Sequence, residues 1–187
     1  ILRPVKNGKN PGIGVYGIGD YSLLTSEGRD IQIRGLYEFL NLSGARISGG
    51  RLYGAGVPKT GNILLAGAYI SQETDLRELE IDGVLYGQGL RTGRLLVREV
   101  RDIDLSCGKI GQVDLLYDKI SNLNLRNGVF ETFNFGGPPN NRLMTLDMRG
   151  TTISQVVGGF PADIRQVYLD PETTIPEDFR EYLRSLR

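Results

Sequence analysis

Residues 103–125 read IDLSCGKIGQVDLLYDKISNLNL, and within this stretch an apolar side chain recurs at every fifth position. The same spacing runs without interruption from Leu90 to Phe135, which gives ten consecutive matches. An α-helix repeats every 3.6 residues and a strand every two, so neither element alone produces this rhythm. The period predicts a chain that winds around an axis and stacks each turn on the one before.

A second pattern identifies the straight parts of each turn. Every other apolar site has a further apolar residue two positions earlier, as in Ile103 with Leu105, and in a strand such residues point to one face. The intervening sites have glycine there instead, as in Gly108 before Ile110, and glycine permits a sharp bend. Strand, corner, strand and corner make a coil of about 20 residues. We therefore predict an all-β fold, a right-handed parallel β-helix, or β-solenoid.

The chain is expected to form one solenoid domain. Its predicted parts are an irregular N-terminal segment at 1–30, coils over 31–170 and a capping helix at 174–187, which together fill residues 1–187. Within these limits, Ile13-Gly14-Val15 and Ile31-Gln32-Ile33 are candidates for early rungs, although their spacing is less regular.

The last residues follow a helical pattern. Thr174-Ile175-Pro176-Glu177 has the form of a capping box with proline in the first turn. Apolar residues follow at helical spacing: Phe179, Tyr182, Leu183 and Leu186. An open solenoid end exposes backbone groups and apolar side chains, so we expect this short helix to cover the last coil. The alternative is that its apolar stripe makes a dimer contact.

Composition narrows the function. Lysine and arginine together number 22, as do aspartate and glutamate, so no overall field favours nucleic acid, and a nucleic-acid partner is not expected. The chain has no histidine, which excludes Ser-His-Asp and Cys-His catalysis and histidine metal sites. We predict no catalytic residue, no metal and no cofactor. The one cysteine, Cys107, follows alternating apolar residues, and we expect it to be buried.

No apolar stretch approaches the roughly 20 residues that a membrane-spanning helix needs, so no membrane span is predicted. The first residue is Ile and not Met, which indicates a processed or excised chain. We expect a soluble protein, and both a cytoplasmic and a periplasmic location fit.

A run of five-residue units carries a family resemblance. Ala45-Arg46-Ile47-Ser48-Gly49, Gly50-Arg51-Leu52-Tyr53-Gly54 and Ala55-Gly56-Val57 resemble tandem pentapeptide repeats, which have a small residue two positions before a central Leu or Phe. The resemblance implies a four-sided right-handed β-helix. Large residues such as Ile103 and Phe133 stand where that family has small ones, so a three-sided β-helix is the alternative.

A row of outward polar side chains is the first candidate site. Aligning the coils on their strands places four residues in one row: Glu80, Asp104, Asn124 and Asp147. Stacked coils lie about 4.8 Å apart, so these side chains are expected to lie side by side. Such a row suits a hard cation or a basic partner. Alternatively, it is a hydrogen-bonded polar ladder on a solvated face, in which Asn124 separates like charges.

Arginines form the second candidate site. Four lie in one short segment, and two more are five residues apart: Arg91, Arg94, Arg98 and Arg101, then Arg46 and Arg51. Equivalent faces of the coils would present them as a basic stripe for a phosphate or an acidic partner. The alternative is that they serve solubility or weak ion pairs with neighbours such as Glu99 and Asp102.

The preferred interpretation is a non-enzymatic interaction or scaffold protein whose flat faces bind another protein. The alternative is a β-helix that binds or cleaves polysaccharide through outward carboxylates and three tyrosines near coil spacing: Tyr53, Tyr69 and Tyr86. The pentapeptide resemblance adds a third possibility, since some members of that family mimic DNA and protect gyrase. Those proteins look strongly acidic, whereas this chain is neutral.

Overall fold

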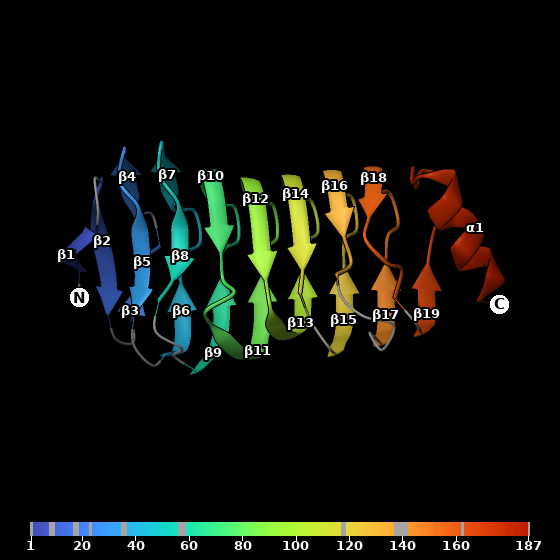
Figure 1. The fold of residues 1–187 in the computed structure, drawn as a ribbon, viewed down its shortest axis with the longest axis horizontal. Coiled ribbons are helices and arrows are strands. Elements are labelled where there is room, and N and C mark those ends of the chain that lie inside the picture. The colour runs from blue at the N-terminus through green and yellow to red at the C-terminus, as the bar shows by residue number, and fades with distance from the viewer. Residues whose placement is uncertain are drawn as a thin grey trace.

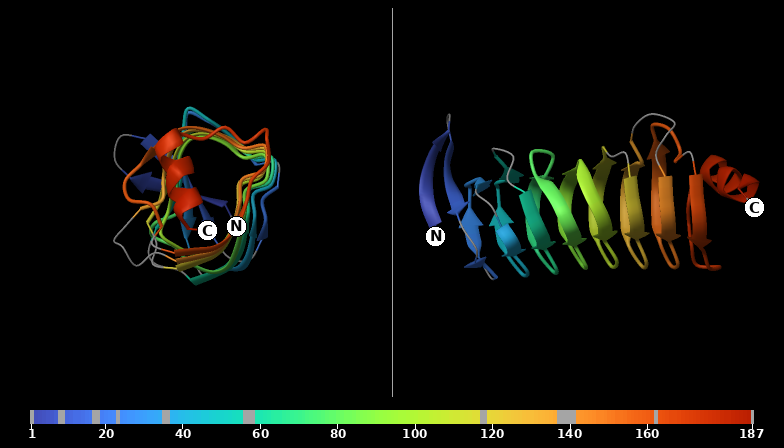
Figure 2. Two further views of the ribbon diagram at one scale, coloured as in Figure 1. Left: turned by 90° about the vertical axis from the view of Figure 1, so that its right-hand side faces the viewer. Right: turned by 90° about the horizontal axis from the view of Figure 1, so that it is seen from below.

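The computed structural model describes residues 2–7, 10–16, 19–22, 24–34, 37–55, 59–116, 119–136, 142–161 and 163–186. These residues form an elongated parallel β-solenoid of about six turns, with one helix, α1 (Glu177–Ser185), at the C-terminal end (Figure 1). Seen along the axis, the coils superpose in one outline, and α1 lies across the end (Figure 2). The structure confirms the predicted β-solenoid with a C-terminal helix.

Two sheets run along the solenoid. Sheet A has 11 strands: β1 (Leu2–Asn7), β2 (Asn10–Tyr16), β4 (Thr25–Glu27), β5 (Ile31–Arg34), β7 (Arg46–Ser48), β8 (Leu52–Gly54), β10 (Tyr69–Asp75), β12 (Arg91–Val97), β14 (Lys109–Leu115), β16 (Val129–Asn134) and β18 (Thr152–Val157). Sheet B has eight: β3 (Gly19–Asp20), β6 (Tyr37–Asn41), β9 (Lys59–Leu64), β11 (Glu80–Tyr86), β13 (Glu99–Asp104), β15 (Lys119–Asn124), β17 (Arg142–Asp147) and β19 (Asp163–Tyr168).

Equivalent residues of neighbouring coils are paired in register, once per coil. One row on sheet B contains Ile103, Leu123, Leu146 and Val167. One row on sheet A contains Leu95, Val113, Phe133 and Val156. The coils have about 21 residues, which matches the predicted length.

The five-residue rhythm marks the inner face of the coils. All ten residues at this spacing from Leu90 to Phe135 are buried, and none is more than 4% exposed. Leu105, Leu125 and Met148 occupy successive positions in one stack and are fully buried. Burying one such side chain contributes about 1.5–3 kcal/mol relative to leaving it in water, so the continuous column is the main source of stability.

The solenoid begins earlier than predicted. Residues 1–30 were expected to be irregular, but strands β1 to β4 lie within them. Strand β2 pairs in parallel with β5, which aligns Ile13 with Ile31 and Val15 with Ile33, as the early-rung assignment predicted. Strand β1 pairs with β2 in the antiparallel direction, so the parallel stack ends there.

The turn after β13 corrects the expectation for Cys107. This residue is exposed, and its φ of 57° lies in the left-handed region. The carbonyl of Leu105 accepts the Gly108 N–H at 3.0 Å, so Cys107 is the third residue of a β-turn that favours glycine. Equivalent turns have Gly89 there, with a φ of 67°. The turn geometry, and not the apolar neighbours, decides the exposure of the thiol.

Helix α1 covers the core at the C-terminal end. Phe179 is fully buried, and its ring centroid lies 5.1 Å from that of Phe135 and 5.1 Å from that of Phe160. The hydroxyl of Tyr182 donates to the Pro161 carbonyl. These contacts extend the aromatic core of the last coils into the helix.

The start of α1 differs from the predicted capping box. The N-cap residue is Pro176, which makes no side-chain capping hydrogen bond, and in the first turn the Phe179 N–H donates to Oδ1 of Asp178 at 2.8 Å. Thr174 instead extends sheet A, because its N–H donates to the Thr151 carbonyl and its carbonyl accepts the Ile153 N–H, both at 2.8 Å. The residue satisfies strand backbone groups that would otherwise lack a partner.

The inward assignment of the rhythm is tested by Leu125→Asp. A charge in the fully buried stack has no counter-ion there, and we expect the free energy of unfolding to fall by about 3–5 kcal/mol. The matched control is Asn124→Asp, which lies one residue away on the outer face and keeps the oxygen that accepts the Arg126 N–H. We expect it to cost less than about 1 kcal/mol. Urea denaturation of both variants checks this, and equal losses would contradict the assignment.

Candidate interaction surface

Three of the four residues predicted to form an acidic row lie together. Asp104, Asn124 and Asp147 are paired in register on β13, β15 and β17. Glu80 is not in this row, because Tyr86 lies beside Asp104. The coil from Tyr86 to Asp104 is shorter than the coil from Asp104 to Asn124. A five-residue rhythm does not reveal this difference, because it fits equally well when one coil is shifted by five residues against the next.

The row supports the turns that follow the strands. The Oδ1 atom of Asp104 accepts the Ser106 N–H at 3.0 Å, and that of Asn124 accepts the Arg126 N–H at 3.1 Å. The same bond recurs at Asp147, where the Arg149 guanidinium also lies 2.6 Å from the carboxylate and lowers the pKa of that carboxyl group. These are Asx turns, so the polar-ladder interpretation fits this row. Among the described residues, no cluster of three or more His, Cys, Asp or Glu is placed to hold a metal ion.

The structure divides the predicted arginine group. Arg94 lies 2.7 Å from the Asp114 carboxylate and 3.8 Å from Glu73. Arg101 is on sheet B, 3.4 Å from Asp102, and Arg98 lies in the connection between the two sheets. Arg51 is held by Asp30 at 2.9 Å. The predicted single stripe therefore does not form from these residues.

A different basic row occupies the outer face of sheet A. It contains Arg46, Tyr69, Arg91 and Lys109, the first residues of β7, β10, β12 and β14. Each is paired with the next, so neighbouring side chains start about 4.8 Å apart. None of the three cations forms a salt bridge with a described residue, and the Tyr69 side chain is 43% exposed. We call these four residues the basic row.

Three members of the basic row, Tyr69, Arg91 and Lys109, line a shallow trough of about 480 Å³. Its floor contains Gly93 and Gly111, and the exposed Val129 and Glu131 lie at one end. A Cβ atom on Gly111 would lie 2.5 Å from the Gly93 carbonyl oxygen, so close packing of the coils requires glycine here. The absence of side chains keeps the floor low beside the cations.

Two members of the basic row, Lys109 and Tyr69, were not assigned to it from the sequence. Each member comes immediately before a buried residue of its strand, as Lys109 does before Ile110. Aligning the coils on these inward residues would have found the row. The three tyrosines proposed for sugar stacking occupy separate rows, since Tyr53 pairs with Asp75 and Tyr86 with Asp104.

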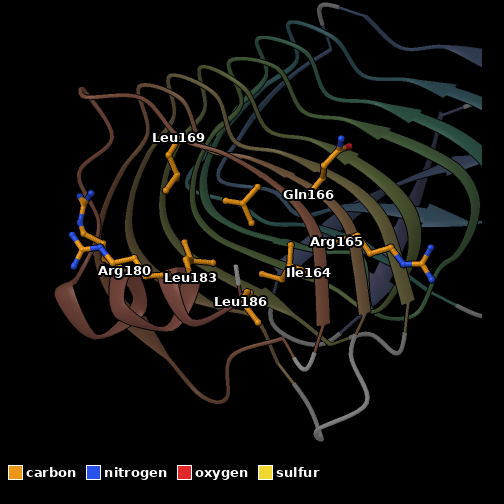
Figure 3. A pocket seen from close by; sticks show the side chains of 9 residues that line it. Ile164, Arg165, Gln166, Leu169, Arg180, Leu183 and Leu186 are labelled. Carbon is orange, nitrogen blue, oxygen red and sulfur yellow. The ribbon is translucent and has the colours of Figure 1, made fainter.

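A second hollow lies at the C-terminal end, between β19 and α1, and we call it the end groove. It has a volume of about 360 Å³, and Ile164, Leu183 and Leu186 converge in it (Figure 3). The charged residues that line it are all arginines: Arg165, Arg180 and Arg184. Arg165 and Arg180 lie on opposite sides of the groove in the close view (Figure 3).

The Arg94–Asp114 pair gives a pH-dependent prediction. Burial alone raises the pKa of Asp114, but hydrogen bonds from Arg94, Asn134 and Gln112 outweigh it and hold that pKa below the usual range. A carboxylate whose pKa is lower in the folded than in the unfolded protein stabilises the fold when the pH is above the unfolded pKa of about 4. This contribution is lost as the pH falls through the pKa of the folded state.

We therefore expect Asp114→Asn to lower the free energy of unfolding by about 1–2 kcal/mol between pH 5 and 8. The difference from the parent protein should shrink below about pH 4, because the parent loses its charge there. Urea titrations at several pH values measure this difference. Asp82→Asn, at an exposed position of β11, is the control. A difference that grows in acid would contradict the expected sign.

Comparison with protein families, with curated proteins and with solved structures finds no significant match for this chain.

Proposed function

We propose that this protein is a non-enzymatic interaction protein whose basic row binds an acidic segment of another protein. The observation that carries the proposal is three cations in consecutive register around an exposed tyrosine, none of them in a salt bridge with a described residue. Closely spaced like charges repel one another, and an anionic partner would relieve that repulsion.

The chemistry of the trough favours a protein partner. Arginine and tyrosine are enriched among the residues that dominate the energy of protein interfaces. Val129, 45% exposed, adds an apolar contact next to Lys109 in the same outer row. A surface that combines cations, a ring and an aliphatic side chain suits a peptide segment with both acidic and apolar residues.

The architecture is proposed to be that of a degenerate pentapeptide-repeat protein. Support comes from the buried residues at five-residue spacing and from Gly108, which is buried at the corner position where the family has a small residue. Of the pentapeptide-like run, Gly56 and Val57 lie outside the described residues. The exposed cations of sheet A give no support to a DNA mimic, which needs a negative surface.

Polysaccharide binding is the second candidate function. The specific observation in its favour is the exposed ring of Tyr69 beside the low floor at Gly93, where a sugar ring could stack. An acidic polysaccharide would also satisfy Arg91 and Lys109, so the two functions need a direct comparison.

The experiment compares three defined anionic probes with the folded protein by fluorescence anisotropy: an acidic peptide that contains leucines, polygalacturonate and a short DNA duplex. The test variant carries Arg91→Glu and Lys109→Glu, which reverse two neighbouring charges of the basic row. The control is Arg126→Glu, an exposed arginine in the turn between β15 and β16. We expect the peptide to bind, and the double variant to weaken that binding about tenfold or more.

The control variant should bind the peptide like the parent protein. Binding of polygalacturonate without binding of the peptide would replace the protein partner by a carbohydrate. Equal weakening by both variants would show a non-specific charge effect and would contradict a site at the basic row.

A further inference from the structure

The two sheets end differently at the C-terminus. On sheet A the chain itself covers the start of the last strand, β18, because Thr174 forms an isolated bridge there with two backbone hydrogen bonds of 2.8 Å to residues 151 and 153. On sheet B the last strand is β19, which pairs with β17 on one side and with no described strand on the other. Half of the N–H and carbonyl groups of such a strand point outward along its free edge.

The free edge adjoins the end groove. Ile164 is 6% exposed and Leu183 is 4% exposed, and both line the groove together with the exposed Leu186. A strand laid against β19 would therefore place alternate side chains over an apolar surface. Strand β19 has six residues, which is long enough to pair with an extended segment of about five or six residues.

The charges that line the groove favour a peptide segment with acidic residues. Arg165 is exposed and forms no salt bridge with a described residue. Arg180 and Arg184 lie 3.7 and 3.0 Å from Glu177, so one carboxylate faces two cations. The lining thus has a net positive charge, and acidic residues beside an apolar strand would complement it.

We propose that the end groove binds an extended, acid-flanked apolar peptide of a partner protein, which adds as a parallel or antiparallel strand to β19. The backbone of the peptide completes the hydrogen bonds of sheet B, and its alternate apolar side chains cover Ile164 and Leu183. Acidic residues at its ends face the groove arginines. The site is separate from the basic row, so either can exist without the other.

A second copy of the chain fits the groove less well. Two copies paired through β19 would bring the arginines of one groove against those of the other, and like charges across an interface are unfavourable. A charged side chain on an edge strand, here Arg165, is also a common protection against self-pairing. These charges favour a different, acidic partner.

The test uses a fluorescent synthetic peptide in which valine alternates with threonine between glutamates at both ends. The first control peptide is N-methylated at alternate backbone nitrogens, which preserves its side chains and removes donors for strand pairing. The second carries lysine in place of glutamate. Two variants of the chain, Arg165→Glu and Leu186→Glu, alter exposed groove positions and should melt like the parent.

We expect the glutamate peptide to bind, and N-methylation, the lysine ends and Arg165→Glu each to weaken binding about tenfold or more. The double basic-row variant Arg91→Glu with Lys109→Glu should still bind the glutamate peptide and should lose that binding on N-methylation, which separates this site from the proposed function. Absence of binding, or equal affinity for the N-methylated peptide, would overturn strand addition. Sedimentation that shows a dimer abolished by Leu186→Glu would overturn it as well, by making a second copy the occupant.

Discussion

Parallel backbone hydrogen bonds hold each coil to the next, and they continue through the turns as well as the strands. In the turn after β13, for example, the Cys107 N–H donates to the Arg126 carbonyl of the following coil at 2.8 Å. This ladder fixes the register between coils, so that an inward residue always meets inward residues and an outward charge always meets the same outer row. The narrow core and the surface rows therefore have one cause.

Position along the strand then decides whether a charge finds a partner inside the protein. Asp104 and Asp147 are the last residues of their strands, where the following turn offers a backbone N–H two residues later. Arg91 and Lys109 are the first residues of theirs, with their side chains above a floor of glycines. Acidic side chains at strand ends are thus used by the fold, whereas cations at strand starts remain available to solvent or to a partner.

The sequence allowed the buried residues of each coil to be predicted. It did not allow residues of different coils to be assigned to rows, because that assignment depends on the length of each coil. The inward set, including Leu105 and Leu125, repeats at a fixed spacing and was predicted residue by residue. Row membership depends on the length of each coil, which varies along the chain in a way that the rhythm does not encode. Glu80 was therefore assigned one pentapeptide away from its true row. Likewise, the left-handed turn position of Cys107 is set by its hydrogen bonds and not by its neighbours in sequence.

The ends of the solenoid show where a stack of coils must stop. On sheet A the parallel pairing ends at the antiparallel strand β1, and at the other end Thr174 adds a one-residue bridge beyond β18. Sheet B begins with β3, a strand of two residues, and a short edge offers little to pair with. It ends with six residues of β19 beside an apolar groove. Among the described strands, β19 therefore combines length, a free edge and adjacent apolar surface, the three features that strand addition requires.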